Sequence, residues 1–439
     1  MIKRKDIKPG ALKIIRILSE NGFQAVLNGG CVRDLVMGRD PKDWDVATNA
    51  DPETVKRLFD RTVPIGIHFG IITVLLEDGQ YEVARFRKDH NYEDGRHPRM
   101  IEFADAEADA QRRDFTVNGM FFDVFTERII DYVGGVKDID QQLIRTIGNP
   151  VERFAEDQLR MLRAVRFAAR LGFAIDEQTQ SAICSGAKRI KQISVERVRE
   201  EISLILTEGS AAIGAQMLMD LGLMSAILPE VSAMKDVPQP SDFHPEGDVW
   251  THVRIMLDQL KSPTRTLAWG VLLHDVGKPP TLTLTDRIRF HGHDTFGARI
   301  ADTICRRLHM SKADSEQIQH LAEHHMRFRN VKEMRPSKLK RFLREEYFPE
   351  LLELHRIDCL ASHGMLDLYD YCKEKLDVAD NETMRPSPLI TGHDLVKMGY
   401  EPGPKFKEIL TVIEDAQLEG NLNSREEAID LVRKLFNLA

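Results

Sequence analysis

Two adjacent glycines constrain the fold of this chain more than any other feature of its sequence. Gly29 and Gly30 follow a short apolar run, Gln24 to Leu27, that predicts a strand, and they precede residues with helical spacing from about Val32 onward. Glycine lets the backbone approach a bound group closely, and the first turn of a helix presents amide N–H groups to anions. The order strand, Gly-Gly, helix therefore predicts a turn that holds a triphosphate.

Two aspartates follow this turn. In an extended segment residues two apart project from the same face, so Asp43 and Asp45 are predicted to converge while Trp44 points into the packed interior. Magnesium prefers oxygen ligands, and two such ions about 4 Å apart activate an attacking hydroxyl and stabilise a leaving pyrophosphate. Arg33, on the predicted helix, is placed to neutralise phosphate charge. Each motif taken alone is more typical of a surface turn.

The order of these motifs resembles the polymerase-beta-like nucleotidyltransferase superfamily. Within it the chain is similar to the bacterial class II group, which holds tRNA CCA-adding enzymes, their CC-adding and A-adding relatives, and poly(A) polymerases. The resemblance implies that Asp43 and Asp45 are catalytic and bind Mg²⁺, while Gly29, Gly30 and Arg33 hold the triphosphate. A third catalytic carboxylate is expected at Glu82 in the predicted strand YEVARF, where a solvated strand-edge glutamate is the alternative.

Two further segments match motifs of the same family. Arg113 and Asp114, in the segment RRDFTVN, resemble its ribose-contacting pair, which monitors the 2′-hydroxyl; the alternative is an ion pair at a helix start. From Glu156 onward the sequence predicts one long helix whose arginines share a broad face. The first of them, Arg160, donates hydrogen bonds and Asp157 accepts them, so the pair could imitate a base edge. The resemblance implies that these two residues read CTP and ATP with support from Arg163 and Arg166, whereas an ordinary solvated helix face is the alternative.

Two segments bear on which member of the family this is. Residues 64–74 resemble the version in tRNA-type enzymes and lack the basic sequence expected of a poly(A) polymerase. Residues 88–99 resemble the flexible loop of CCA-adding and A-adding enzymes, and an ordinary mobile hairpin is the alternative. Full CCA addition and addition of the terminal A alone remain open.

Histidines are concentrated in the second half of the chain. Twelve of the fifteen lie between His244 and His393, and the dipeptide His274-Asp275 resembles the signature of the HD superfamily of metal-dependent phosphohydrolases. Imidazole suits transition metals such as Ni²⁺ or Mn²⁺. The resemblance implies an activity on RNA ends, although single histidines of this kind are usually core or surface residues. The dipeptide His324-His325 offers the later histidine, and the predicted ligand set is His252, His274, Asp275, His293, His324 and Asp358.

The chain is predicted to be α+β, with several domains. We expect a nucleotidyltransferase head over residues 1–147, a helical neck and body for base selection and RNA binding over 148–236, a helical HD domain over 240–365 and a helical, tRNA-binding tail over 366–439. The boundaries follow two Pro-rich stretches, 237–248 and 381–389. The net charge of −8 requires any RNA contact to use local basic patches, such as those within 327–344 and 188–191, which are equally well explained as solvated faces.

Composition places the chain in a reducing compartment. The five cysteines are far apart, without the spacing of a zinc site or a disulfide framework. No stretch approaches the roughly 20 apolar residues of a membrane span, so we expect a cytoplasmic protein with no membrane partner. The predicted function is template-independent addition of CCA, or its last A, to tRNA from CTP and ATP. The alternatives are a poly(A) polymerase and an HD phosphohydrolase with an RNA-binding head; the oligomeric state is open.

Overall fold

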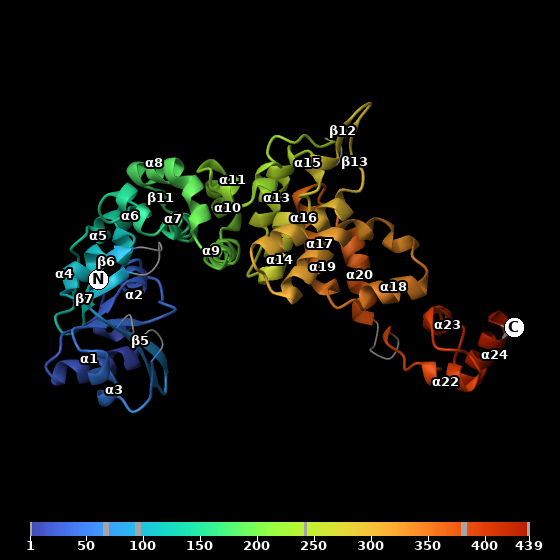
Figure 1. The fold of residues 1–439 in the computed structure, drawn as a ribbon, viewed down its shortest axis with the longest axis horizontal. Coiled ribbons are helices and arrows are strands. Elements are labelled where there is room, and N and C mark those ends of the chain that lie inside the picture. Colours follow the sequence, from blue (N-terminus) through green and yellow to red (C-terminus); the bar gives the residue numbers. More distant parts are fainter. Residues whose placement is uncertain (1, 65–69, 93–97, 241–243, 379–383, 437–439) are drawn as a thin grey trace. The chain divides into compact units, whose positions relative to one another are not determined.

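The chain folds into two compact units, Met1–Ser232 and Ala233–Ala439. The computed structural model describes residues 2–64, 70–92, 98–240, 244–378 and 384–436 (Figure 1). No helix among these residues is both long enough and apolar enough to cross a bilayer. The predicted α+β class, a head with a mixed sheet followed by helical domains, is confirmed.

The head is built on a seven-stranded mixed sheet in the order β3-β4-β5-β2-β1-β8-β9. All its pairings are antiparallel except that of β2 with β5. The strands are β1 (Ala25–Asn28), β2 (Asp45–Thr48), β3 (Thr62–Val63), β4 (Ile71–Leu76), β5 (Gly79–Arg85), β8 (Phe121–Asp123) and β9 (Arg128–Ile130). The helices of the head are α1 (Pro9–Glu20), α2 (Gly30–Val36), α3 (Pro52–Leu58), α4 (Ala106–Gln111) and α5 (Gly135–Asp140).

The centre of this sheet is buried. β1 and β2 are almost wholly inaccessible, since α1 packs against both and α4 covers one face. On that face Val26 and Ala47 are cross-strand neighbours and lie in one apolar cluster with Ala106 and Ala110 of α4. Small alanines let the helix approach the sheet closely. The central strands are therefore held rigidly, and so are the polar residues at their ends.

The neck and body are helical, as predicted, apart from one short strand. Gly172 ends α7 in the left-handed region (φ 73°), and the chain turns back so that β11 (Ala174–Ile175) pairs in parallel with β10 (Leu143–Ile144). This two-residue strand was not predicted, because its partner lies far away in the sequence. The helices are α6 (Pro150–Glu156), α7 (Leu159–Leu171), α8 (Glu177–Gly186), α9 (Val195–Thr207), α10 (Ala211–Asp220), α11 (Leu223–Ile227) and α12 (Pro229–Ser232).

The second unit begins with a helical bundle. Its one hairpin in the described residues, β12 (Leu282–Leu284) with β13 (Ile288–Phe290), leads directly into α16. The bundle helices are α13 (Val249–Asp258), α14 (Arg265–Leu273), α15 (Lys278–Thr281), α16 (His293–Arg307), α17 (Lys312–His324), a 3-10 helix (His325–Glu333), α18 (Pro336–Leu343), α19 (Phe348–Ala361) and α20 (Asp367–Val378).

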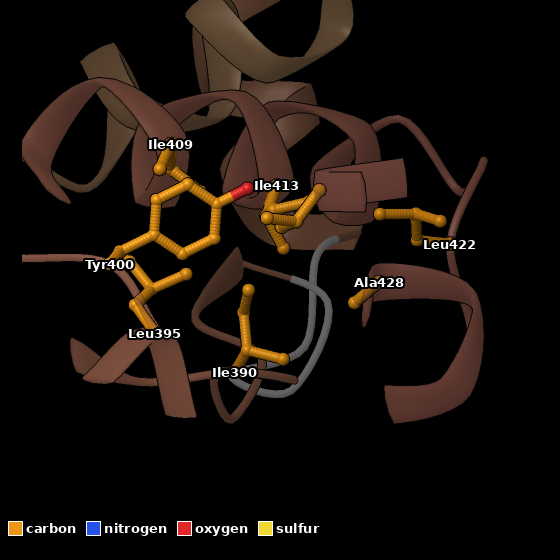
Figure 2. Packing of buried hydrophobic residues seen from close by; sticks show 8 residues of the cluster. Ile390, Leu395, Tyr400, Ile409, Ile413, Leu422 and Ala428 are labelled. Carbon is orange, nitrogen blue, oxygen red and sulfur yellow. The ribbon is translucent and has the colours of Figure 1, made fainter. Parts of the chain in front are cut away.

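The C-terminal tail has an apolar core of its own. It consists of α22 (Gly392–Lys397), α23 (Pro404–Leu418) and α24 (Arg425–Leu435), and Figure 2 shows Leu395 and Tyr400 facing Ile409 and Ile413. The side chains of Thr391 and Ser424 belong to capping boxes that begin α22 and α24. The tail is thus a small folded body rather than an extended arm.

Ion pairs attach this tail to α18. Arg341 lies 2.6 Å from Glu414, Arg335 lies 2.7 Å from Asp415, and Arg344 also pairs with Glu414. Nζ of Lys340 donates to the Leu418 carbonyl at 2.7 Å. The basic run within 327–344, which we considered for RNA contact, is therefore largely neutralised by the protein's own acceptors. Its partners lie about 70 residues away in the sequence, so the run looked free in the sequence alone.

Replacing Glu414 with Gln should loosen the tail. The substitution removes the partner of two arginines, and because these groups are partly exposed the loss is at most about 1 kcal/mol and shrinks at high salt. Hydrogen exchange of the α23 amides, measured at low and at high salt, tests this. Glu408→Gln, an exposed glutamate on the same helix, serves as the control. Equal exchange in the two variants at low salt would contradict the proposed attachment.

Candidate active site and metal centre

The glycine turn is shaped for close approach. Gly29 has φ 69°, a conformation that favours glycine, and a Cβ there would lie 2.9 Å from Nη1 of Arg113, so a larger residue would also displace that guanidinium. Its amide donates to the Met120 carbonyl of the neighbouring strand region at 3.1 Å. Gly30 is the first residue of α2. The predicted strand, turn and helix are all present.

Arg33 is a buried side chain of α2. It donates from Nε and Nη2 to Oδ1 of Asp34, at 2.9 and 2.7 Å, and from Nη1 to Oδ1 of Asn118 at 2.7 Å. The guanidinium is therefore locked in one orientation. Asn118, which was not among the predicted site residues, links this helix to the ribose motif.

The two aspartates differ from the prediction in one respect. Asp45 is the first residue of β2, but Asp43 lies in a bend before it, so the pair is not carried by one strand. Trp44 is buried between them, as expected, and anchors the bend. Both aspartates nevertheless line the same cavity. The chain reaches this arrangement through a turn rather than through strand alternation.

A third carboxylate lies beside Asp45. In the parallel pairing of β2 with β5, Glu82 is the register partner of Asp45. Burial and the charges of Glu82 and Asp43 together raise the pKa of Asp45 to about 6, against the opposing charge of Arg113. Three acidic groups that repel one another in a partly desolvated place favour a bound cation. The strand-edge alternative for Glu82 is compatible with this position, since its side chain is exposed.

Arg113 and Asp114 make separate contacts. Arg113 pairs with Asp109 of α4 at 2.9 Å and donates to Oδ1 of Asn28 at 2.8 Å, across to the end of β1. Asp114, whose side chain is 11% exposed, accepts from Nε of Arg163 at 2.8 Å. Burial alone would raise the pKa of Asp114, but Arg163 and the hydrogen bond from Asn118 outweigh it and hold the pKa at about 2. Asp114 is a permanent anion at the centre of the site.

The predicted long helix is broken in the structure. α6 ends at Glu156, Asp157 caps its C-terminus, and α7 starts at Leu159, so Asp157 does not lie on the arginine helix. Its Oδ1 accepts from the Leu159 amide at 3.0 Å, which starts the new helix. Arg160 reaches back to Glu156 at 2.6 Å. Periodicity alone could not reveal the break, because the polar residues keep the same spacing through it.

A neighbouring helix supplies the partners of these side chains. On α9, Oε2 of Glu201 lies 2.7 Å from Nε of Arg166, and Oε1 lies 3.7 Å from Arg163. Arg197 of the same helix holds Oδ2 of Asp157 at 2.7 Å. None of the α9 residues was predicted to belong to the site. The only signal in the sequence was the mixed charge of VERVREE, which is also typical of an exposed helix.

These residues enclose one cavity of about 460 Å³. Its lining holds both carboxylates, among them Asp43 and Asp45, and the arginines of α7. Among the predicted head residues only Glu82 is not part of its lining. The lining includes Gly29, Gly30, Arg33, Asp43, Asp45, Arg113, Asp114, Asp157, Arg160, Arg163 and Arg166, together with the unpredicted Lys42, Asn118, Phe167 and Arg170.

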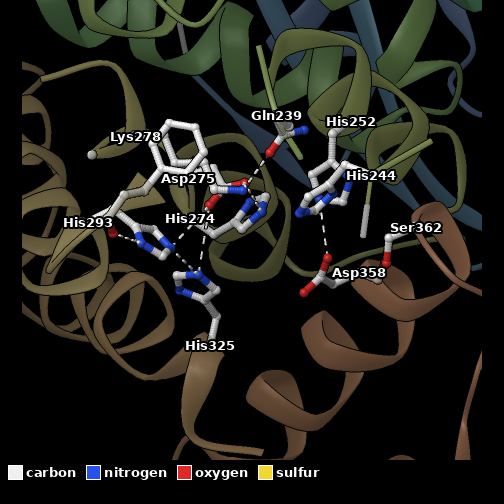
Figure 3. A network of polar contacts seen from close by, with 12 residues as sticks. Gln239, His244, His252, His274, Asp275, Lys278, His293, His325, Asp358 and Ser362 are labelled. Carbon is white, nitrogen blue, oxygen red and sulfur yellow. Dashed lines mark hydrogen bonds and ion pairs between the residues drawn. The ribbon is translucent and has the colours of Figure 1, made fainter. Parts of the chain in front are cut away.

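The second unit gathers histidines and aspartates in the core of its bundle (Figure 3). Asp275 is central: its Oδ2 lies 3.2 Å from Nε2 of His274, and its Oδ1 lies 3.7 Å from His293 and 3.8 Å from His325. Nε2 of His252 lies 3.1 Å from Oδ1 of Asp358. Groups of these side chains have ligand atoms close enough together to hold a metal ion.

Hydrogen bonds fix which ring nitrogens face the cluster. Nδ1 of His293 and Nδ1 of His325 contact the carbonyls of Phe290 and Ala322, at 2.9 and 2.8 Å. A carbonyl only accepts, so both Nδ1 atoms carry the proton and the Nε2 lone pairs point inward. These two Nε2 atoms lie 3.3 Å apart. Two facing lone pairs repel, and a cation between them and the unbonded Oδ1 of Asp275 would relieve that repulsion. The residues fit a divalent metal.

One predicted ligand must be corrected. His325, not His324, faces Asp275; His324 is the last residue of α17 and its ring packs on that of His320, with centroids 4.4 Å apart. Neighbouring residues on a helix point about 100° apart, so the two cannot serve the same site. Which of them faces inward depends on the rotation of α17 in the bundle, and the dipeptide itself does not encode that.

Comparisons with known proteins agree with this geometry. The chain is 30% identical over 430 residues to a CCA-adding enzyme from Enterococcus faecalis, an alignment that covers 95% of this chain and 94% of the relative. The chain belongs to the CCA-adding enzyme family. The chain is also 47% identical to the Bacillus subtilis CCA-adding enzyme over 197 residues. That alignment covers 45% of this chain and 49% of the relative, so the chain spans about half the length of that relative.

Domain families and solved structures of CCA-adding enzymes extend the match. The Poly A polymerase head domain matches residues 25–145, the probable RNA and SrmB-binding site of polymerase A matches 172–235, and the HD domain matches 248–362. The crystal structure of the Bacillus stearothermophilus CCA-adding enzyme in complex with CTP superposes with a TM-score of 0.75 at 25% identity and covers 98% of this chain and 99% of that one. The fold is also that of the Thermotoga maritima CCA-adding enzyme complexed with tRNA, at a TM-score of 0.61 and 18% identity, covering 98% of this chain and 96% of that one.

Glu201 should be essential to the stability of the first unit of this CCA-adding enzyme family member. Glu201→Ala leaves the buried Arg166 with Glu208 alone, so we expect unfolding to become easier by about 3 kcal/mol. Urea denaturation measures the change. Glu200→Ala alters the adjacent residue, whose pair with Arg199 is more exposed, and should cost less than about 1 kcal/mol. Equal losses in the two variants would contradict this account of the pocket.

Proposed function

We propose that the protein is a tRNA nucleotidyltransferase that adds CCA, or its terminal A, to tRNA 3′ ends from CTP and ATP without a nucleic-acid template. One observation carries the proposal: residues from four separate motifs of the head and neck line a single cavity that holds both carboxylates and arginines. A metal-bound nucleoside triphosphate has the matching distribution of charge. The E. faecalis relative, named a CCA-adding enzyme, aligns over nearly the whole chain.

Asp43 and Asp45 would hold Mg²⁺, with Glu82 as a further catalytic carboxylate. When bound, the metal would supply activation of the attacking 3′-hydroxyl and stabilisation of the leaving pyrophosphate. Support comes from the shared cavity of the two aspartates and from the register of Asp45 with Glu82. Gly29, Gly30 and the locked guanidinium of Arg33 would receive the triphosphate.

Arg113 and Asp114 would check the ribose, and Asp157 with Arg160 would read the base. Arg163 and Arg166 would support them. Arg163 links the ribose motif to the base-reading residues, because it pairs with Asp114 and lies on the same helix as Arg160. Hydrogen bonds to a cytosine or adenine edge would have to replace the pairing of Arg160 with Glu156.

The other parts of the chain would handle the RNA. We assign residues 1–147 to the head, 148–236 to the neck and body, 240–365 to the HD domain and 366–439 to the tail, with tRNA as the partner. The arms of the loop over 88–99 lie in β6 (Arg87–Tyr92) and β7 (Pro98–Phe103), and its tip lies outside the described residues, as does part of 64–74. All five cysteines are free, which supports a cytoplasmic location.

For the second unit we infer a phosphohydrolase-type centre that holds Ni²⁺ or Mn²⁺ and acts on RNA ends. The ligands would be His252, His274, Asp275, His293, His325 and Asp358. Buried imidazoles and carboxylates are the donor set that such ions prefer, and the inward lone pairs described above support it.

Three tRNA substrates test the transferase. With tRNA that lacks CCA we expect incorporation of CTP, with tRNA ending in CC incorporation of ATP, and with complete tRNA no incorporation. The double substitution Asp43→Ala and Asp45→Ala should lower the rate of nucleotide addition at least about 1000-fold, which corresponds to roughly 4 kcal/mol of activation free energy. Asp40→Ala with Asp60→Ala, at two exposed positions, should leave it unchanged. Use of ATP alone would show that the protein adds only the terminal A. Long poly(A) products would show that it is a poly(A) polymerase instead. Nucleotide addition by the Asp43/Asp45 double variant would refute the proposed catalytic site.

The HD centre is tested by a pair of neighbouring alanine substitutions. His325→Ala removes an inward imidazole and should weaken Ni²⁺ binding by roughly 10-fold or more, whereas His324→Ala should bind Ni²⁺ like the unmodified protein. Calorimetric titration of the metal-free protein measures both. Equal affinities in the two variants would show that the bundle core is not the nickel site.

A further inference from the structure

Four imidazoles surround Asp275, and three of them are oriented by the backbone. Nδ1 of His274, His293 and His325 each contacts the carbonyl three residues earlier, at 2.8 to 2.9 Å. All three histidines stand at helix ends: His274 caps the C-terminus of α14, His293 opens α16, and His325 follows α17. The carbonyls of Val271 and Ala322 lie in the last turns of α14 and α17, where no amide follows four residues ahead in the helix, so they are available to accept from a side chain. The carbonyl of Phe290 lies at the end of β13, just before α16.

His252 is in a different position. It lies inside α13, where the preceding carbonyls are taken up by the hydrogen bonds of the helix. Its ring is completely buried, so water cannot orient it either. The acceptor for its Nδ1 is a side chain: Oε1 of Glu246 lies 2.7 Å away and also contacts Nδ1 of His244 at 2.9 Å. Figure 3 shows the rings of His252 and His244 close together and a dashed line that joins His252 to Asp358.

The backbone around Glu246 is itself held in place. Gly247 has φ 125°, a conformation that other residues rarely adopt, and Asp248 caps α13 by accepting from the Thr251 amide at 2.9 Å. Asp248 also accepts from the Asp236 amide at 2.6 Å. The Glu246 side chain is 7% exposed, and its second oxygen is buried without a hydrogen bond. Burying a carboxylate with one oxygen unbonded costs free energy, and the contact of its other oxygen with the imidazole of His252 offsets part of that cost.

We propose that Glu246 is the positioning residue of the metal centre: it fixes the Nδ1-protonated form of His252 and turns the Nε2 lone pair toward Asp358 and the ion. Glu246 does not touch the ion itself. A carboxylate partner makes an imidazole a stronger metal donor than a backbone carbonyl does. This inference rests on the metal centre proposed above.

The consequence is a graded loss of metal affinity. Glu246→Ala removes both acceptor and charge, and it should weaken binding roughly 10- to 100-fold. Glu246→Gln keeps an acceptor oxygen but not the charge, and it should give an intermediate loss. Glu333→Ala, an exposed glutamate of the same unit, is the matched control and should bind the metal like the unmodified protein.

Co²⁺ titrated into the metal-free full-length protein is the probe, because its visible absorption reports imidazole ligation separately from oxygen-only binding in the head. We expect the unmodified protein and Glu333→Ala to share one spectrum and affinity, and both Glu246 variants to shift. Nucleotide addition by the head and the melting temperature, unchanged in Glu246→Gln, verify that the chain is folded. Unaltered affinity and spectrum in both Glu246 variants would overturn the positioning role alone. Absence of an imidazole-type spectrum in the unmodified protein would overturn the metal centre together with it.

Discussion

The pairing of buried guanidinium groups with carboxylates is the constraint on which the first unit depends. Arg166 is buried, and Arg163 bridges Asp114 and Glu201. An unpaired charge in such a place would cost several kcal/mol, so α9 and the ribose motif must both be present for α7 to present its arginines to the cavity. The same pairs hold the guanidiniums in one geometry. Folding of the neck and construction of the cavity are therefore one event.

A second feature of the cavity is that two of its aspartates, Asp45 and Asp114, have pKa values shifted in opposite directions. Burial and two neighbouring acids raise the pKa of Asp45, whereas Asp114, which lines the same cavity, has its pKa held low by Arg163. Asp45 lacks a cationic partner strong enough to offset its burial, whereas Asp114 has such a partner in Arg163. Asp45 is thus left available for a metal, and Asp114 is left available as a fixed hydrogen-bond acceptor. The chemistry of the two aspartates differs through their neighbours and not through their type.

The parts of this arrangement that lie close together in the chain were predictable. The strand, the Gly-Gly turn, α2 and the two aspartates span about twenty residues, and local patterns predicted them apart from the bend at Asp43. The features that escaped prediction depend on distant segments. The break at Asp157 is held by Arg197 from α9, and the basic run of α18 is neutralised by α23. Likewise the choice of His325 over His324 depends on how α17 packs in the bundle. Periodicity describes one element at a time and says nothing of such partners.

Each unit brings together groups that repel one another and have no partner among the described residues that fully relieves the repulsion. In the head these are the carboxylates beside Asp45, and in the bundle they are the facing Nε2 atoms of His293 and His325, held 3.3 Å apart by their own backbone hydrogen bonds. Relaxing either arrangement would require moving elements whose positions are set elsewhere, β2 by the buried centre of the sheet and α16 by its packing against α17. The repulsion is therefore retained in the folded protein, and a cation is the group that would relieve it in each place.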